Sequence, residues 1–494
     1  MKNNRVHTFK DDALADLDAC GVATRIASGE VSAREVVEAA IARAHDADPI
    51  LRGLATEDFD RALSAGDHRG GGAFGGVPTA IKDNTALAGL PTQFGSTAFR
   101  AAPASANGHF VDQMVRTGMI PIGKTRLPEF AFNVTCEYTR DEPVRNPWNT
   151  DYSAGGSSGG AAALVAAGVV PIAHATDAGG SIRIPAAACG LVGLKPSRGR
   201  LVEDVSEKAM PLRIAVQGVL TRSVRDTARM MFEAERRYRN ARLRPVCDVA
   251  GSSRTRLRIG VLSAAPTPSP VDSETRESIR LTADLLDSLG HHVTAVAVPV
   301  RPDFMRDYLL YMGLLMTSIR SAATRIVGSS LDRAELEATT SGLCDRYRRA
   351  SLRTPIAIHR LREVQKRFRS TFDHVDVLLS PAVAHSTPIL GHLSPDQPFD
   401  SWFERLSAFD CYAPLNNISG TPAITLPLHR TRSGLPLASH FSANIGDERT
   451  LLELAFELEE AMPWARIDNQ PQPIPAPDEV GSIDAGRDTA RRPG

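Results

Sequence analysis

The stretch AGGSSGGAAALVAAGVVPIAHATDAGGSIRIPA, residues 154–186, decides the fold. It places two glycine- and serine-rich segments, 154–160 and 177–181, on either side of a run of small apolar side chains. Short apolar runs that alternate with glycine clusters are typical of an α/β core, in which buried strands and helices are joined by tight loops. The same character extends from about residue 70 to about residue 230, so we expect an α/β protein.

Composition and charge exclude several classes of protein. The chain has 494 residues, of which 42% are hydrophobic, and this content is enough for a full globular core. The 57 Lys and Arg residues balance the 57 Asp and Glu residues, so no overall positive field is available to hold a nucleic acid or an anionic membrane. The six cysteines lie far apart with no CxxC pair, which argues against a zinc site and a disulfide scaffold. We expect no metal and no cofactor.

No segment of the sequence reads as a targeting signal or a membrane span. The first residues, MKNNRVHTFKDDALADLDA, lack the apolar stretch of a signal peptide. The longest apolar run, 161–173, is too short to cross a bilayer and contains Gly168 and Pro171. We therefore expect a cytoplasmic protein with no membrane and no nucleic-acid partner.

Hydrophobic periodicity predicts the elements outside the core. Three- and four-residue spacings favour helix through residues 10–65, with Ser32 and Glu35 forming a capping box. Residues 257–300 read strand, helix, strand, and residues 303–370 are rich in helix and arginine. Strands are expected within 375–391 and 421–428, and an amphipathic helix over 447–462.

These patterns divide the chain into consecutive parts. The predicted parts are an N-terminal helical region (1–65), a core with the glycine-rich loops (66–300), a helix-rich insert (301–370), the C-terminal part of the core (371–468) and a polar, proline-rich flexible tail (469–494).

One motif suggests phosphate binding but lacks the required context. Residues 118–125, GMIPIGKT, match the nucleotide-binding pattern GxxxxGK[ST]. That pattern requires a preceding strand and a loop of free N–H groups, whereas 109–117 has helical spacing and Pro121 has no N–H to donate. We interpret 118–125 as containing a short buried strand.

Three segments together carry the residues of an acyl-transfer site. Lys82 follows the apolar run of GVPTAIKDN (76–84), so its stem should enter the core, where burial lowers a lysine pKa towards the range of a useful base. Hydroxyls at Ser153, Ser157, Ser158 and Ser181 lie in loops whose glycines allow close backbone approach. A lysine base, serine hydroxyls and a turn of converging N–H groups are the components of a serine–lysine site.

Other catalytic arrangements have less support. His174 lies near the second loop, but no spaced partner completes a Ser-His-Asp triad, and the GxSxG pattern is absent around Ser181. We interpret His174 as a packed or hydrogen-bonded side chain. Asp177 and Arg183 are expected to pair and stiffen the loop rather than to take part in chemistry.

The segment 155–200 resembles the signature of the amidase signature family, and further blocks resemble the family across most of the chain. These are GVPTAIKDNTALAGLPTQFGS (76–96), GKTRLPEF (123–130), NPWN (146–149) and SGTPAITLPL (419–428). The separations of 75 residues from Lys82 to Ser157 (157 − 82) and 24 from Ser157 to Ser181 (181 − 157) also fit. In appearance the chain is most similar to the bacterial subgroup that includes 6-aminohexanoate cyclic-dimer hydrolases.

The resemblance implies a single large amidase-signature fold, with a central mixed β-sheet covered by helices on both faces. It also implies roles for individual residues. Ser181 would be the nucleophile, Lys82 the base, and Ser157 the bridging serine held after a cis peptide bond. Backbone N–H groups of the loop before and at Ser181 would form the oxyanion hole, and other loop residues would support the site. The oxyanion-hole residues before Ser181 are Ala178, Gly179 and Gly180. The supporting residues are Gly156, Ser158, Thr176, Asp177 and Arg183.

The function implied is hydrolysis of a small-molecule carboxamide through a Ser181 acyl-enzyme, with a homodimer as the family expectation. Two alternatives use the same chemistry: an acyltransferase or ring-forming biosynthetic enzyme, and the glutaminase subunit of a tRNA-dependent amidotransferase. The resemblance also implies that the insert, 301–370, contributes to the substrate pocket. Five of its side chains recur at helical spacing, and we interpret them as buried core residues on one helix face and not as residues that line the substrate pocket. They are Phe304, Tyr308, Tyr311, Met312 and Met316.

Overall fold

The computed structural model describes residues 4–68, 71–262, 264–265, 269–297, 300–324 and 328–468. The tail predicted for 469–494 lies outside these residues, as do Ser263 and residues 298–299 at the ends of two predicted strands.

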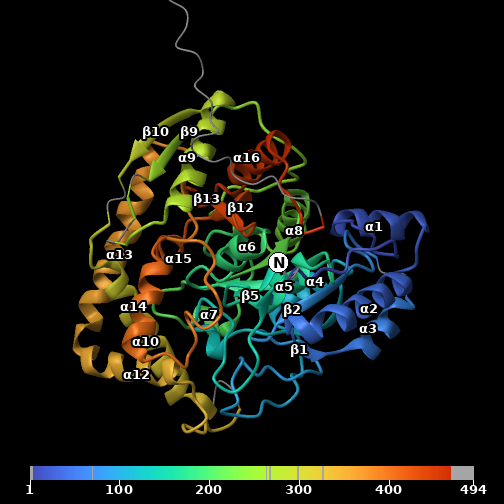
Figure 1. The fold of residues 1–494 in the computed structure, drawn as a ribbon, viewed down its shortest axis with the longest axis horizontal. Coiled ribbons are helices and arrows are strands. Elements are labelled where there is room, and N and C mark those ends of the chain that lie inside the picture. Colours follow the sequence, from blue (N-terminus) through green and yellow to red (C-terminus); the bar gives the residue numbers. More distant parts are fainter. Residues whose placement is uncertain are drawn as a thin grey trace, which may run out of the picture.

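A large mixed sheet forms the centre of the molecule (Figure 1). Its strands in sheet order are β10 (His292–Val296), β9 (Arg258–Leu262), β11 (Val377–Pro381), β13 (Pro436–Ala443), β12 (Ala423–Arg430), β7 (Val192–Lys195), β8 (Val216–Thr221) and β6 (Ile172–Asp177). Strands β10, β9 and β11 pair in parallel, and the remaining pairs are antiparallel. The predicted mixed α/β fold is therefore confirmed.

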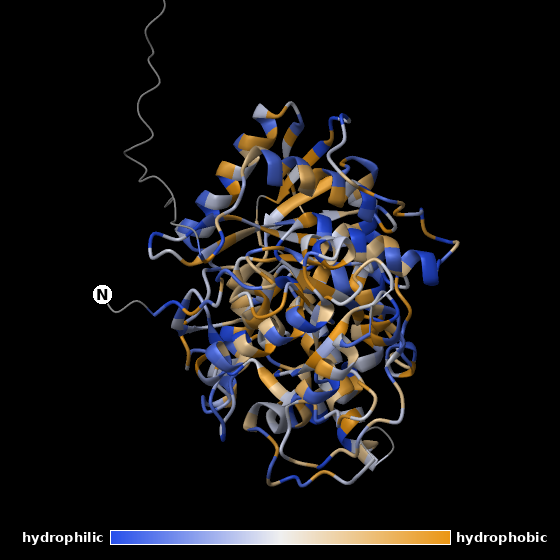
Figure 2. Ribbon diagram, turned by 90° about the vertical axis from the view of Figure 1, so that its right-hand side faces the viewer, coloured by the Kyte–Doolittle hydropathy of each residue, from blue (hydrophilic) through white to orange (hydrophobic). Residues whose placement is uncertain are grey.

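Helices cover both faces of this sheet because alternate strand residues enter different cores. Ile172 and Val219 pack in one buried cluster, which holds apolar side chains of the outer helices, whereas their neighbours Ala173 and Leu220 pack in another. A strand directs successive side chains to opposite faces, so each face needs its own covering layer. In Figure 2 the outer helices alternate hydrophilic and hydrophobic residues, as amphipathic helices do.

The helices follow in chain order. They are α1 (Ala19–Ser28), α2 (Ala33–Leu51), α3 (Phe59–Gly66), α4 (His109–Val115), α5 (Gly159–Ala166), α6 (Arg183–Cys189), α7 (Val205–Lys208), α8 (Val224–Arg237), α9 (Ser273–Ser288), α10 (Phe304–Ser321), α12 (Ala338–Ala350), α13 (Thr354–Ser370), α14 (Phe399–Phe409), α15 (Pro414–Ser419) and α16 (Glu448–Ala461), with short 3-10 turns η1 (Glu129–Ala131), η2 (Ser351–Arg353) and η3 (Thr371–Asp373).

A small sheet beside the large one positions the lysine segment. It contains β1 (Leu54–Glu57), β3 (Ile120–Thr125) and β2 (Pro78–Lys82), with β3 in the middle. Strands β2 and β3 are parallel, and Lys82 is in register with Thr125. The hydroxyl of Thr79 donates to the carbonyl of Ile172, which ties β2 to β6 of the large sheet. A further two-stranded sheet joins β4 (Arg145–Asn146) and β5 (Asn149–Ser153).

Several sequence predictions are confirmed and one is wrong in part. The capping box of Ser32 and Glu35 opens α2, and 118–125 contains the strand β3. The helix predicted from residue 10 begins only at Ala19, because Asp12 binds two backbone N–H groups in a turn and Asp18 caps α1. Strand β1 also interrupts the region predicted as helical.

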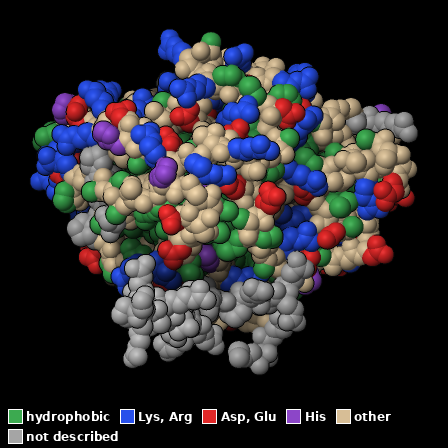
Figure 3. All heavy atoms as spheres, turned by 90° about the horizontal axis from the view of Figure 1, so that it is seen from above, with side chains coloured by type: hydrophobic (Ala, Val, Ile, Leu, Met, Phe, Trp, Pro, Cys, Tyr) green, Lys and Arg blue, Asp and Glu red, His purple; other side chains and the backbone are tan. Residues whose placement is uncertain are grey.

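Helices α10, α12, α13 and α14 lie at the left and lower left of Figure 1. Their buried side chains form a separate core around Trp402, Phe304 and Phe368. Basic and acidic side chains are interspersed over the face shown in Figure 3. Within the described ranges, no helix is both long enough and apolar enough to cross a membrane.

Candidate active site

Lys82 occupies the end of a fully buried strand. Every residue of β2 is buried, and Lys82 is 0% exposed. Its Nζ lies 2.8 Å from Ser157 Oγ, 2.8 Å from Ser158 Oγ and 3.0 Å from Thr176 Oγ1. Burial lowers the pKa of Lys82 to about 7, because the charged form loses its hydration. The stem of Lys82 enters the core as predicted.

The first glycine-rich loop delivers its serines to this amine. The peptide bond between Gly156 and Ser157 is cis, as the family resemblance implied. A Cβ on Gly156 would lie 2.7 Å from the backbone nitrogen of Thr135, so glycine is needed for this close approach. Ser153 does not join the group, because its hydroxyl accepts a hydrogen bond from the N–H of Gly155.

The two loops meet at Thr176. The Ser158 hydroxyl donates to the Thr176 carbonyl at 3.3 Å. The Asn84 side chain donates to Thr176 Oγ1 at 2.9 Å. Asn84, two residues after Lys82, thus fixes the hydroxyl that contacts the lysine, a role not predicted from the sequence.

A buried ion pair holds the second loop. Arg183 Nε lies 2.9 Å from Asp177 Oδ2, and both side chains are 0% exposed. Burial by itself raises the pKa of Asp177, but the Arg183 guanidinium outweighs it and holds the pKa well below its usual range. Asn417 of α15 donates to Asp177 and accepts from Arg183, so the pair has further support that the sequence did not reveal.

The N–H groups around Ser181 differ in availability. The N–H of Gly180 donates to Asp177 Oδ1 at 2.8 Å, so it stabilises the loop instead of offering a free donor, contrary to its predicted place in the oxyanion hole. Gly180 also has φ +118°, a backbone conformation that favours glycine. In the described part of the chain, the N–H groups of Ala178, Gly179 and Ser181 have no partner.

Ser181 lines a small cavity of about 50 Å³, which side chains of α10, α12 and α14 also line. The Ser181 hydroxyl forms no hydrogen bond within the described residues, so it is not linked to Ser157 in this arrangement. Tyr308 and Met312 also line the cavity, whereas Phe304, Tyr311 and Met316 are buried elsewhere. The predicted core stripe is therefore right for Phe304, Tyr308, Tyr311 and Met316, which are buried, whereas Met312 is only partly buried.

His174 is a packed histidine, as predicted. It is 0% exposed, its Nε2 lies 2.7 Å from Gln217 Oε1, and its Nδ1 accepts the backbone N–H of Lys82. Burial lowers the pKa of His174 to about 4, so the ring is neutral at physiological pH. It positions the lysine backbone and does not face Ser181.

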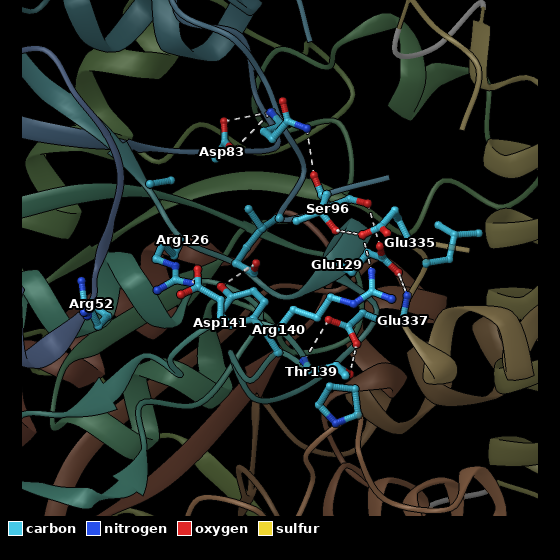
Figure 4. Close-up of a pocket in the computed structure, with 18 of the residues that line it drawn as sticks. Arg52, Asp83, Ser96, Arg126, Glu129, Thr139, Arg140, Asp141, Glu335 and Glu337 are labelled. Carbon is cyan, nitrogen blue, oxygen red and sulfur yellow. Dashed lines mark hydrogen bonds and ion pairs between the residues drawn. The ribbon is translucent and has the colours of Figure 1, made fainter. Parts of the chain in front are cut away.

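A second, larger pocket of about 1150 Å³ lies away from Ser181 (Figure 4). Its labelled charged residues, Arg52 apart, have partners within the protein: Arg126 with Asp141, Arg140 with Glu335, Asp83 with Lys124, Glu129 with Ser96, and Glu337 with Thr139. No group of three or more metal-binding side chains occurs in the part of the chain that the structure describes.

Lys82 contacts the hydroxyls of Ser157 and Ser158 at the centre of the fold, and comparison with known proteins defines the class as an amidase, a hydrolase of carbon–nitrogen bonds other than peptide bonds. The Amidase family profile matches residues 35–452, and the chain belongs to the amidase signature family.

Individual relatives agree with this assignment. The chain is 49% identical over 464 residues to “Putative amidase AmiC” of Mycobacterium leprae, covering 94% of this chain and 99% of the relative. It is 31% identical to 6-aminohexanoate-cyclic-dimer hydrolase of a Pseudomonas strain, covering 93% and 98%. The solved structure of a 6-aminohexanoate cyclic dimer hydrolase superposes with a TM-score of 0.84 at 29% identity, covering 94% and 99%.

Proposed function

We propose that this chain hydrolyses a small-molecule carboxamide through an acyl-enzyme on Ser181, with Lys82 and Ser157 as the proton relay. The observation that carries the proposal is the contact of a buried lysine, whose pKa is about 7, with Ser157 at 2.8 Å and with no carboxylate. A lysine in this state is half neutral near pH 7 and is able to accept a proton.

The hydrogen bonds around Lys82 favour Ser157 as the proton donor. A neutral amine has two N–H donors and one lone pair, so it satisfies three neighbours by donating twice and accepting once. The Ser158 hydroxyl gives its proton to the Thr176 carbonyl, and Thr176 Oγ1 already accepts from Asn84. Ser158 and Thr176 are therefore suited to accept from Lys82, which leaves the Ser157 proton to face the lone pair.

The reaction then proceeds in two stages. Lys82 takes the proton of Ser157, Ser157 takes the proton of Ser181, and Ser181 Oγ attacks the amide carbonyl. Free N–H groups of the loop bind the oxyanion, and one such donor is typically worth about 10²–10³ in rate. The proton returns through Ser157 to the leaving nitrogen, and water activated by the same relay releases the carboxylic acid.

A hydrolysis screen over aliphatic, aromatic, peptide-like and lactam amides tests the proposal. We expect turnover of at least one class, and a loss of about 10⁴-fold or more in Ser181→Ala with the fold retained by circular dichroism. Near-full activity of the Ser181→Ala protein would contradict the proposal of an acyl-enzyme on Ser181. The matched control is Ser153→Ala, at a serine that does not contact Lys82.

A further inference from the structure

Asp410, the residue that follows α14, has a buried carboxyl group with an unused oxygen. Asp410 is 5% exposed, and its Oδ1 has no hydrogen-bond partner among the residues described. The other buried carboxylates near the site are paired, Asp177 with Arg183 and Asp83 with Lys124. A buried polar atom without a partner is costly, and such an atom indicates a place for a ligand.

This carboxyl group lies beside the loop that leads to Ser181. Asp410, Gly179 and Ser181 line the same cavity. A Cβ built on Gly179 would lie 3.9 Å from Asp410 Oδ2. Since the Gly179 N–H is one of the free donors for the substrate oxyanion, a group bound by Asp410 would be only a few bonds from the substrate carbonyl.

The rest of the cavity offers no competing polar group of this kind. Asn133 donates to the Leu393 carbonyl and accepts from the N–H of Val134, so both ends of its amide are engaged. The Tyr308 hydroxyl donates to the Ala178 carbonyl at 3.3 Å. The remaining side chains of the wall are apolar, among them Met305, Leu309, Met312, Leu343 and Leu406.

We propose that Asp410 binds an amino group on the acyl part of the substrate, so that the substrate class is small amides of aliphatic amino acids. This inference rests on the proposed function, because it places the substrate carbonyl at Ser181. A carboxylate attracts a compact ammonium group in a dry cavity, and the apolar wall accommodates an aliphatic chain. The cavity of about 50 Å³ favours a short chain.

Burial makes the charge of Asp410 depend on a cation beside it. It raises the pKa of Asp410 well above its usual range, so the carboxyl group is held neutral until a bound cation stabilises the carboxylate. A bound ammonium supplies both a positive charge and N–H donors. The site therefore gains more from an aminated substrate than from one of the same shape without the amine.

The test compares leucinamide with 4-methylpentanamide, which has the same carbon skeleton without the amine. Binding is measured by calorimetry to the Ser181→Ala protein, so that turnover does not interfere. We expect leucinamide to bind about tenfold to hundredfold more tightly, as for a buried charged hydrogen bond. Adding Asp410→Asn should remove the difference. Glu137→Gln, at a buried carboxyl whose Oε1 is also unpartnered but which does not line this cavity, should retain it.

Each outcome decides the inference. Equal affinity for the two amides, no binding of either, or a preference that survives Asp410→Asn overturns it. If Asp410→Asn does not fold, the comparison of the two amides in the Ser181→Ala protein alone decides. Failure of the proposed function is seen separately, as absence of turnover by the wild-type protein across the amide screen.

Discussion

Two buried lysines on neighbouring strands differ in whether a carboxylate lies beside the amine. Lys82 of β2 and Lys124 of β3 are both 0% exposed. Lys82 contacts three hydroxyl groups and no carboxylate. Lys124 lies 2.7 Å from Asp83 and also donates to the Pro91 carbonyl and the Thr92 hydroxyl.

The difference assigns them different roles. Burial lowers the pKa of both lysines, but the Asp83 carboxylate opposes the shift at Lys124. Lys124 is thus a structural cation that neutralises a buried acid, and Lys82 is suited to be a base. Lys124 is also the lysine of the GKT motif, and its engagement with Asp83 explains physically why that motif does not offer a phosphate site.

The largest expected effect is on catalysis. Lys82→Met should lower kcat/KM by about 10²–10⁴-fold, because it removes the general base. Lys124→Met should keep near-normal activity per folded molecule, because Lys124 contacts none of the serines. The measurement is steady-state hydrolysis normalised to the folded fraction. Equal losses in the two variants would remove the distinction between the lysines.

Stability should show the opposite order. Lys124→Met leaves Asp83 buried without its cation and should lower the free energy of unfolding by about 3–5 kcal/mol. Lys82→Met leaves no carboxylate unpaired and should cost less. Urea denaturation followed by circular dichroism measures both. A larger loss in Lys82→Met than in Lys124→Met would show that the ion pair is not what stabilises this region.

The pH profile sharpens the comparison. The neutral form of Lys82 is the active base, so its fraction and kcat/KM should rise as the pH increases through about 7 and then level off. Lys195 is also buried with a pKa of about 7, but it donates to the Pro196 carbonyl and contacts none of the site serines. The Lys195→Gln variant should therefore retain the rise of kcat/KM with pH. If substitution of Lys195, and not of Lys82, changes the pH at which kcat/KM rises, the rise would be assigned to Lys195 instead of Lys82.

The smallest expected effect concerns the hydroxyls around Lys82. Thr176→Val removes one contact of the amine and should lower kcat by about tenfold, the usual cost of one hydrogen bond. Thr125→Val is the matched control, since Thr125 is in register with Lys82 but its buried hydroxyl has no hydrogen-bond partner. A fall in activity for Thr125→Val as large as for Thr176→Val would indicate general disturbance of the strands.

Local patterns made much of this structure predictable. The capping box at Ser32, the strand in 118–125 and the buried stem of Lys82 each depend on neighbours in sequence, and all three are observed. The α/β fold and the amidase family followed from ordered blocks of sequence. The start of α1 was mispredicted because Asp12 and Asp18 stabilise a turn and a cap that override the apolar spacing.

The features that escaped prediction depend on long-range contacts. Asp410 and Asn417 lie far from the glycine loops in sequence and reach them only through packing of α14 and α15. Tyr308 is a core residue as predicted, but helical spacing could not show that it also lines the cavity with Ser181. The loss of Gly180 as a free donor depends on the rotamer of Asp177, which sequence does not specify.

The most direct test of the central claim is fluorophosphonate labelling followed by intact-mass and peptide mass spectrometry. The proposal that neutral Lys82 activates Ser181 through Ser157 predicts a single adduct on Ser181, formed at a rate that rises with pH through about 7. The adduct should form far more slowly in Lys82→Met and at the normal rate in folded Lys124→Met. An adduct on another residue, or full-rate labelling of Ser181 in Lys82→Met, would contradict the account.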